Sequence, residues 1–328
     1  MKKSPSPPVW PRRIPWVLLL WMGLLTLSAA ACSAPDTPPD DAVDSPAQPQ
    51  YVTTIHPFSA ILTPVVGDAG RVTTLLDPAD SPHTYEPRPS DLRRVSGSTA
   101  LFFGAPHLDG WATDLQAPTR IELLGLLPPE HRKTFEGTHG HASPAATASA
   151  EAKAKIDPHF WTDPLAVRAL LPALADTLCH LDATGCTTYR ANADSFATEL
   201  TVLNDRLDVQ MRPLQPAPVL LSQPFFRYFL QRYGLELVGV VEPRPGQEPS
   251  PRTLQAVVQR AAAEDVRAIL VQEQLPARAA QAVAEAAGLP LVRLDPIGGS
   301  AGRRTYAELL QYNASLVRNR LTSPTNAP

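Results

Sequence analysis

The fold is decided by a long, proline-free stretch, residues 188–212, which reads TYRANADSFATELTVLNDRLDVQMR. Its apolar residues recur at helical spacing and place four side chains on one stripe: Phe196, Leu200, Leu203 and Leu207. A helix of this length spans roughly 35–40 Å at a rise of 1.5 Å per residue. That is long for a helix within one lobe, so the stretch predicts a rigid helix that connects two lobes.

Short apolar runs alternate with helical patterns on both sides of this stretch. Before it, the patterns predict strands over 51–55, 72–76, 100–103 and 120–124, and helices over 58–66, 89–95 and 166–181. After it, they predict strands over 219–221, 235–241, 268–271 and 289–294, and helices over 225–233, 251–264 and 277–287. This alternation predicts an α/β fold with two parallel-sheet lobes joined by a long spine helix. A ligand cleft is expected between the lobes, because open parallel sheets bind ligands beyond the carboxyl ends of their strands.

The first 31 residues have the pattern of a secretory signal peptide. Four basic residues precede an apolar run over 14–27 that is too short for a stable membrane-spanning helix, and small residues then lead to Cys32. A Cys in this place resembles the lipobox of bacterial lipoproteins, although Ala29 stands where those sequences prefer Leu. We expect a lipidated Cys32 that anchors the protein to a membrane, with ordinary cleavage and a free Cys32 as the alternative.

Length and charge set the organisation of the exported part. The 328 residues suffice for about two domains. Residues 32–50 predict a Pro/Asp-rich tether, 51–165 a first α/β lobe with a mobile loop at 128–156, 166–213 the spine region, and 214–328 a second α/β lobe. Loss of residues 1–31 removes four bases and changes the net charge from −3 to −7. No long basic run remains, so we expect no binding to nucleic acid.

The folded part contains an even pair of cysteines, Cys179 and Cys186. In an oxidising compartment this pair predicts a disulfide, with two buried thiols as the alternative.

Three short phrases place possible metal ligands on stiff backbone. His83 lies in SPHTYEPRPS (81–90), His159 lies in DPHFWTDP (157–164), and Asp295 follows a predicted strand in LDPIGG (294–299). Donors fixed in this way can impose their geometry on a metal ion.

These phrases, in this order, resemble the solute-binding proteins of zinc- and manganese-specific ABC importers, in particular the zinc-binding, ZnuA-like proteins. Further matching positions are Tyr189, Asn192, and the phrases at 233–235 and 248–250. The resemblance implies two lobes with one metal ion between them, and His83, His159 and Asp295 as ligands. It also implies an ABC permease and its ATPase as partners, a periplasmic or other extracytoplasmic location, and a monomer.

The fourth ligand of the family, His or Glu, aligns here with Gln223, which departs from the pattern. Gln223 could coordinate through its neutral amide oxygen or hydrogen-bond a metal-bound water. A third interpretation takes a ligand from the loop with His139 and His141. Glu273 could compensate for the weak donor at Gln223. The alternative is that Glu273 is an ordinary acidic residue at the surface.

The donor types bear on the metal. Two imidazoles favour Zn²⁺ over Mn²⁺, whereas an amide and a carboxylate favour the harder ion. The short His139-Gly-His141 segment resembles the His-rich loop of zinc-binding members. We therefore expect Zn²⁺, with Mn²⁺ or Fe²⁺ as alternatives.

The function predicted is capture of the ion and delivery to the permease, without catalysis. Binding through histidine should weaken as the pH falls through about 6.5. A metal-dependent hydrolase is the first alternative, because a weak ligand at Gln223 could leave an open metal position. An adhesin-like lipoprotein that has lost import function is the second.

Overall fold

The computed structural model describes residues 48–135, 156–243 and 248–322. The predicted signal peptide, Cys32, most of the tether, and His139 and His141 lie outside these ranges.

The first lobe is built on a four-stranded sheet. Its strands are β1 (Gln50–Thr53), β2 (Arg71–Thr74), β3 (Ala100–Phe103) and β4 (Arg120–Glu122), in the order β2-β1-β3-β4 and all parallel. The helices of this part of the chain are α1 (His56–Val66), α2 (Pro89–Ser96), α3 (Pro106–Asp109) and α4 (Leu123–Leu126). Strand β3 is buried at every residue, as its uninterrupted apolar sequence requires of a central parallel strand.

The second lobe repeats this plan. Its strands are β5 (Pro218–Leu221), β6 (Glu236–Val240), β7 (Ala268–Gln272) and β8 (Leu291–Leu294), again parallel and in the equivalent order β6-β5-β7-β8. The helices between these strands are α8 (Arg227–Arg232), α9 (Pro251–Ala263) and α10 (Arg278–Ala287). The two parallel-sheet lobes confirm the predicted fold class.

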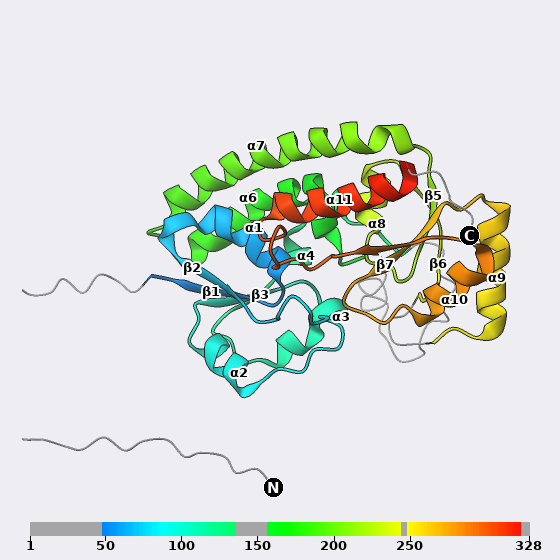
Figure 1. Cartoon of the computed structure of the whole chain (residues 1–328). Helices are drawn as coiled ribbons and strands as arrows, with labels where there is room; N and C mark the ends of the chain where they lie inside the picture. Colours follow the sequence, from blue (N-terminus) through cyan, green and yellow to red (C-terminus); the bar gives the residue numbers. More distant parts are fainter. Residues whose placement is uncertain (1–47, 136–155, 244–247, 323–328) are drawn as a thin grey trace, which may run out of the picture. The chain divides into compact units, whose positions relative to one another are not determined.

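Two helices connect the lobes. Helix α6 (Pro164–Leu181) packs along α7 (Cys186–Met211), and α7 also contacts α1 of the first lobe and α11 (Tyr306–Thr322), which follows the last strand of the second sheet in the chain (Figure 1). The predicted stripe of α7 is buried as expected. Among the described residues, α6 is the one helix whose length and hydropathy would suit a membrane span, but its apolar face lies in the protein core.

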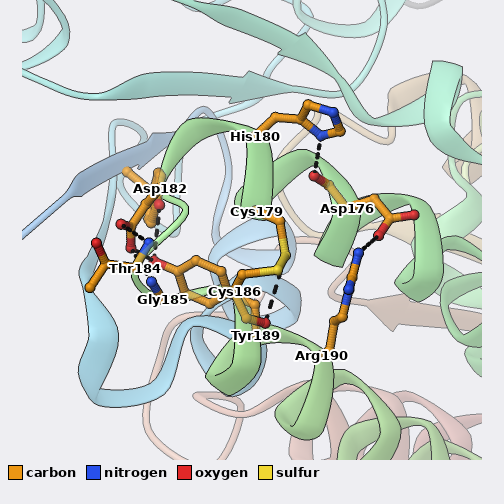
Figure 2. The surroundings of a disulfide bond; sticks show 10 residues. Asp176, Cys179, His180, Asp182, Thr184, Gly185, Cys186, Tyr189 and Arg190 are labelled. Carbon is orange, nitrogen blue, oxygen red and sulfur yellow. Dashed lines mark hydrogen bonds and ion pairs between the residues drawn. A yellow bond between two sulfur atoms is a disulfide. The ribbon is translucent and has the colours of Figure 1, made fainter.

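A disulfide joins the ends of these two helices. Cys179 in the last turn of α6 is bonded to Cys186 at the start of α7 (Figure 2). Next to it, the Tyr189 hydroxyl donates to Asp182 Oδ2 at 2.6 Å, and Asp182 also accepts the backbone N–H groups of Thr184 and Gly185. The tight turn between α6 and α7 is therefore held by a covalent bond and by one carboxylate.

The structure departs from the predicted elements at several places. Leu123 and Leu124 begin α4 instead of extending strand β4, and the Leu124 N–H still bonds to the Gly104 carbonyl just after β3. The described residues of the predicted loop at 128–156 include a 3-10 turn at Pro129–His131 and a bridge between Thr134 and Ile156. Helices α3 and α11 are not among the predicted elements.

Candidate functional site

His159 is held by a buried carboxylate two residues earlier. Asp157 is fully buried, and its Oδ1 accepts from His159 Nδ1 at 2.7 Å and from the His159 backbone N–H at 2.9 Å. A carboxylate only accepts, so Nδ1 carries the ring proton and a neutral ring keeps a free lone pair on Nε2. This carboxylate–histidine arrangement is the one that commonly orients a metal-binding imidazole.

The rest of the DPHFWTDP phrase fixes the same segment to its surroundings. The Trp161 indole donates to the Pro296 carbonyl at 2.9 Å. Asp163 caps α6 through the Leu165 N–H and pairs with both Nε and Nη2 of Arg232 at 2.8 and 2.9 Å. Since Pro296 and Arg232 belong to the second half of the chain, this phrase contacts both lobes.

His83 lies beside His159, with 5.9 Å between the ring centroids. It lies within a turn that the Thr84 N–H closes by bonding to the Ser81 carbonyl, and the Trp111 indole donates to the neighbouring Pro82 carbonyl at 2.9 Å. Burial and the nearby imidazoles of His159 and His107 lower the pKa of His83 to about 3. His83 is therefore neutral near pH 7 and available as a ligand.

His107 is a third imidazole of this region, and the sequence analysis does not single it out. Its Nε2 lies 2.8 Å from the Ile156 carbonyl, and burial lowers its pKa. The signal that could have found it is its place just after strand β3, in the first turn of α3.

Gln223 follows strand β5 and is 3 % exposed. Its Nε2 donates to Glu242 Oε2 at 3.0 Å, and its Oε1 accepts from the Ser222 hydroxyl at 3.2 Å. Glu242 is not among the predicted site residues; it follows the neighbouring strand β6 and reaches Gln223 because parallel strands end at one sheet edge. The Gln223 amide is therefore hydrogen-bonded to a carboxylate.

Asp295 follows strand β8 and is 2 % exposed. Its Oδ1 accepts from Gln274 Nε2 at 2.7 Å and from two backbone N–H groups of the next turn. Its Oδ2 accepts from Arg303 Nη1 at 2.7 Å. The carboxylate is therefore bonded at both oxygens to the protein itself.

Glu273 is part of the same cluster. Its Oε2 accepts from Arg303 Nη1 at 2.7 Å, and its side chain is 45 % exposed. Its neighbour Gln274 donates both to Asp295 and to the Pro78 carbonyl of the first lobe, the latter at 3.2 Å. Glu273 thus pairs with an arginine.

The structure brings His83 and His159 together and leaves the second-lobe donors engaged elsewhere. In the described ranges of the chain, no three His, Cys, Asp or Glu side chains gather closely enough to hold a metal ion. In place of a shared ion, Asp295 is paired with Arg303 and Gln223 with Glu242. His139 and His141 lie outside the described residues.

The sequence pattern of the zinc-uptake complex component A periplasmic family, ZnuA, matches residues 52–319. The chain belongs to this family. The match covers both sheets, His83, His159, Gln223 and Asp295. ZnuA-family proteins are solute-binding components of transporters, so the predicted family is confirmed.

Individual relatives agree with this assignment to the ZnuA family. The chain is 30 % identical over 289 residues to the high-affinity zinc uptake system protein ZnuA of Paracoccus denitrificans, covering 80 % of this chain and 89 % of that protein. It is 25 % identical over 297 residues to the manganese-binding lipoprotein MntA of Halalkalibacterium halodurans, covering 88 % and 93 %.

Solved structures show the same fold. A crystal structure of ZnuA superimposes with a TM-score of 0.67 at 24 % identity, over 84 % of this chain and 99 % of that one. The solute-binding protein FpvC of Pseudomonas aeruginosa, solved in complex with Mn²⁺, gives 0.69 at 24 % identity, over 84 % and 98 %. At these identities the likeness establishes the architecture of the ZnuA-family chain.

Proposed function

We propose that this protein captures a divalent transition-metal ion outside the cytoplasmic membrane and delivers it to an ABC permease with its ATPase. Family membership supports a role in transport. The neighbouring imidazoles of His83 and His159 are the observation that supports metal binding. His159 is oriented by Asp157 at 2.7 Å, and His83 is neutral beside it. Two fixed, neutral imidazoles are typical ligands of zinc and its neighbours.

The proposed ligand set is His83, His159 and Asp295, with Gln223 as the fourth position. Asp295 and Gln223 bring oxygen donors from the ends of β8 and β5. Binding requires these two side chains to exchange their present partners for the ion. Capture without turnover is the proposed activity, and the hydrolase alternative is not supported by any feature described above.

Zinc is the proposed ion, because both first-lobe donors are imidazoles. The Gln223–Glu242 pair favours the alternative, manganese, since amide and carboxylate oxygens suit the harder ion. A manganese-binding lipoprotein is also among the relatives. Zinc and manganese are therefore compared in the same experiment.

Calorimetry on metal-stripped exported protein tests the function. We expect one equivalent of Zn²⁺ to bind, more tightly than Mn²⁺, and elemental analysis of protein purified without chelator should find the same ion. A variant with both His83→Ala and His159→Ala is the matched comparison. Equal metal binding by this variant and the wild type would contradict the proposal.

The membrane anchor is a separate proposal. Lipidation of Cys32 would hold the domain at a membrane through the tether, close to the permease. Wild-type protein should partition into the detergent phase of a Triton X-114 extraction, and Cys32→Ala should remain in the aqueous phase. Equal partitioning would show that Cys32 carries no lipid.

A further inference from the structure

The two carboxylate oxygens of Asp295 differ in their neighbours. Oδ1 accepts three hydrogen bonds, from Gln274 Nε2 at 2.7 Å, from the Ile297 N–H at 3.0 Å and from the Gly298 N–H at 2.9 Å. Each carboxylate oxygen offers about two lone-pair positions. Oδ1 is therefore saturated, and Oδ2 is the oxygen through which Asp295 can reach a metal ion. That oxygen accepts from Arg303 Nη1 at 2.7 Å.

We propose that Arg303 competes with the metal ion for Oδ2 of Asp295. Its guanidinium occupies Oδ2 of Asp295 in the metal-free protein and leaves this oxygen when the ion binds, so that Arg303 sets the affinity. This inference rests on the proposed function. Oδ2 has a second lone-pair position, but a guanidinium and a dication at one buried oxygen repel each other, so occupation by one disfavours occupation by the other.

Arg303 has other partners that it can keep when it releases Asp295. The same Nη1 donates to Glu273 Oε2 at 2.7 Å, and the guanidinium carbon lies 4.5 Å from the centre of the Tyr312 ring. Glu273 is 45 % exposed, so this second carboxylate leads toward solvent. Only the contact with Asp295 has to break.

The loop that carries Arg303 allows such a movement. The Arg303 backbone is held by short-range bonds, its N–H to the Ser300 carbonyl at 3.0 Å and its carbonyl to the Gly299 N–H at 2.9 Å. Gly298 and Gly302 have φ angles of 72° and 75°, which favour glycine. The guanidinium can therefore withdraw without breaking a helix or a strand.

Charge balance explains why an arginine is paired with Asp295. Asp295 is 2 % exposed, and a buried carboxylate without a partner destabilises the fold. Arg303 supplies the positive charge while the ion is absent. Because binding and stability are linked, removing Arg303 must destabilise the metal-free protein and tighten metal binding together.

The test compares Arg303→Gln with two matched variants of the exported protein. Arg303→Lys keeps the charge, and Arg304→Gln makes the same charge change at the exposed neighbouring residue. We measure zinc affinity by competition with a fluorescent chelator, and thermal unfolding with and without Zn²⁺. Arg303→Gln should bind zinc about tenfold more tightly, melt lower without zinc and gain a larger zinc-induced shift. Arg303→Lys should stay within a few-fold of the wild type, and Arg304→Gln should not differ from it.

Several outcomes would overturn the inference. Unchanged or weaker zinc binding by Arg303→Gln, or an equal fall of both melting temperatures, would mean that Arg303 is structural. If that variant does not fold, the guanidinium NMR signals of Arg303 in the wild type, assigned from their loss in Arg303→Lys, still decide. They should shift when zinc is added, and constant signals would refute the exchange. Failure of the wild type to bind zinc would instead overturn the proposed function.

Discussion

The two halves of the candidate metal centre are prepared in opposite ways. In the first lobe, His159 is oriented by Asp157, and His83 lies beside it as a neutral ring. In the second lobe, Asp295 is paired with Arg303 and Gln223 with Glu242. If the proposed ligand set is right, the first half already presents its imidazoles, whereas the second half has to give up protein contacts before it can bind the ion. We therefore expect the affinity to depend on preorganisation in the first lobe and on exchange of partners in the second.

Removal of a first-lobe imidazole should have the largest effect. His159→Ala, and separately His83→Ala, should weaken zinc binding by about a hundredfold or more, since each deletes a preformed ligand and exceeds the typical 10–100-fold effect of a supporting residue. Calorimetry measures it, and circular dichroism checks the fold. His131→Ala, in the Pro129–His131 turn, is the control. An equally large loss of zinc affinity in His131→Ala would mean that His83 and His159 are not special among the histidines.

Loss of the carboxylate that orients His159 should have the next largest effect. Asp157→Asn keeps the size of the side chain but no longer requires the proton on Nδ1, so zinc affinity should fall by about 10–100-fold. The control is Asp176→Asn, which breaks an exposed pair with Arg190. Wild-type affinity in Asp157→Asn would mean that the first half is not preorganised by this contact.

The lowered pKa of His83 predicts a pH-dependent stability of the metal-free protein. An unfolded chain binds a proton at this His below about pH 6.5, whereas the folded protein resists it until about pH 3. The stability contribution is present above pH 6.5 and is lost as the pH falls toward 3. Urea unfolding at pH 7 and 4.5 should show a fall in the free energy of unfolding about 2 kcal/mol larger in the wild type than in His83→Asn. An equal fall in the free energy of unfolding of both proteins would mean that His83 is in contact with solvent.

The smallest effect is expected at the departure from the family ligand. Gln223→Ala should weaken zinc binding by less than about tenfold, because a neutral amide oxygen is a weak donor and the substitution leaves Glu242 in place. Competition with a chelator measures the change. A hundredfold loss would instead rank Gln223 with the imidazoles and remove the difference between the halves.

The sequence predicted the architecture because its signals are local. The buried run over 100–103 and the stripe of α7 depend on periodicity alone, and the structure agrees with both. His83 and His159 were predicted as neighbours from the family resemblance, and both lie in phrases whose backbone is tied by short-range contacts.

The sequence could not predict the partners of the second-lobe donors. Glu242 meets Gln223 only through the register of β5 with β6, and Arg303 meets Asp295 through a turn whose course no periodicity encodes. Charged residues on such turns are also common in sequences without a site. For the same reason the sequence does not predict that Glu273 pairs with Arg303, because Glu273 is equally consistent with an ordinary surface acid.

The contact of Trp161 with Pro296 bears on how far the two halves can separate. The indole lies two residues after His159, and the carbonyl that it bonds lies one residue after Asp295. The Tyr306 hydroxyl also donates to the Trp161 carbonyl at 2.7 Å, which fixes the same residue from the second side. Any separation of the two halves at this point would have to break both hydrogen bonds of Trp161, so this residue ties the segment after His159 to the segment after Asp295.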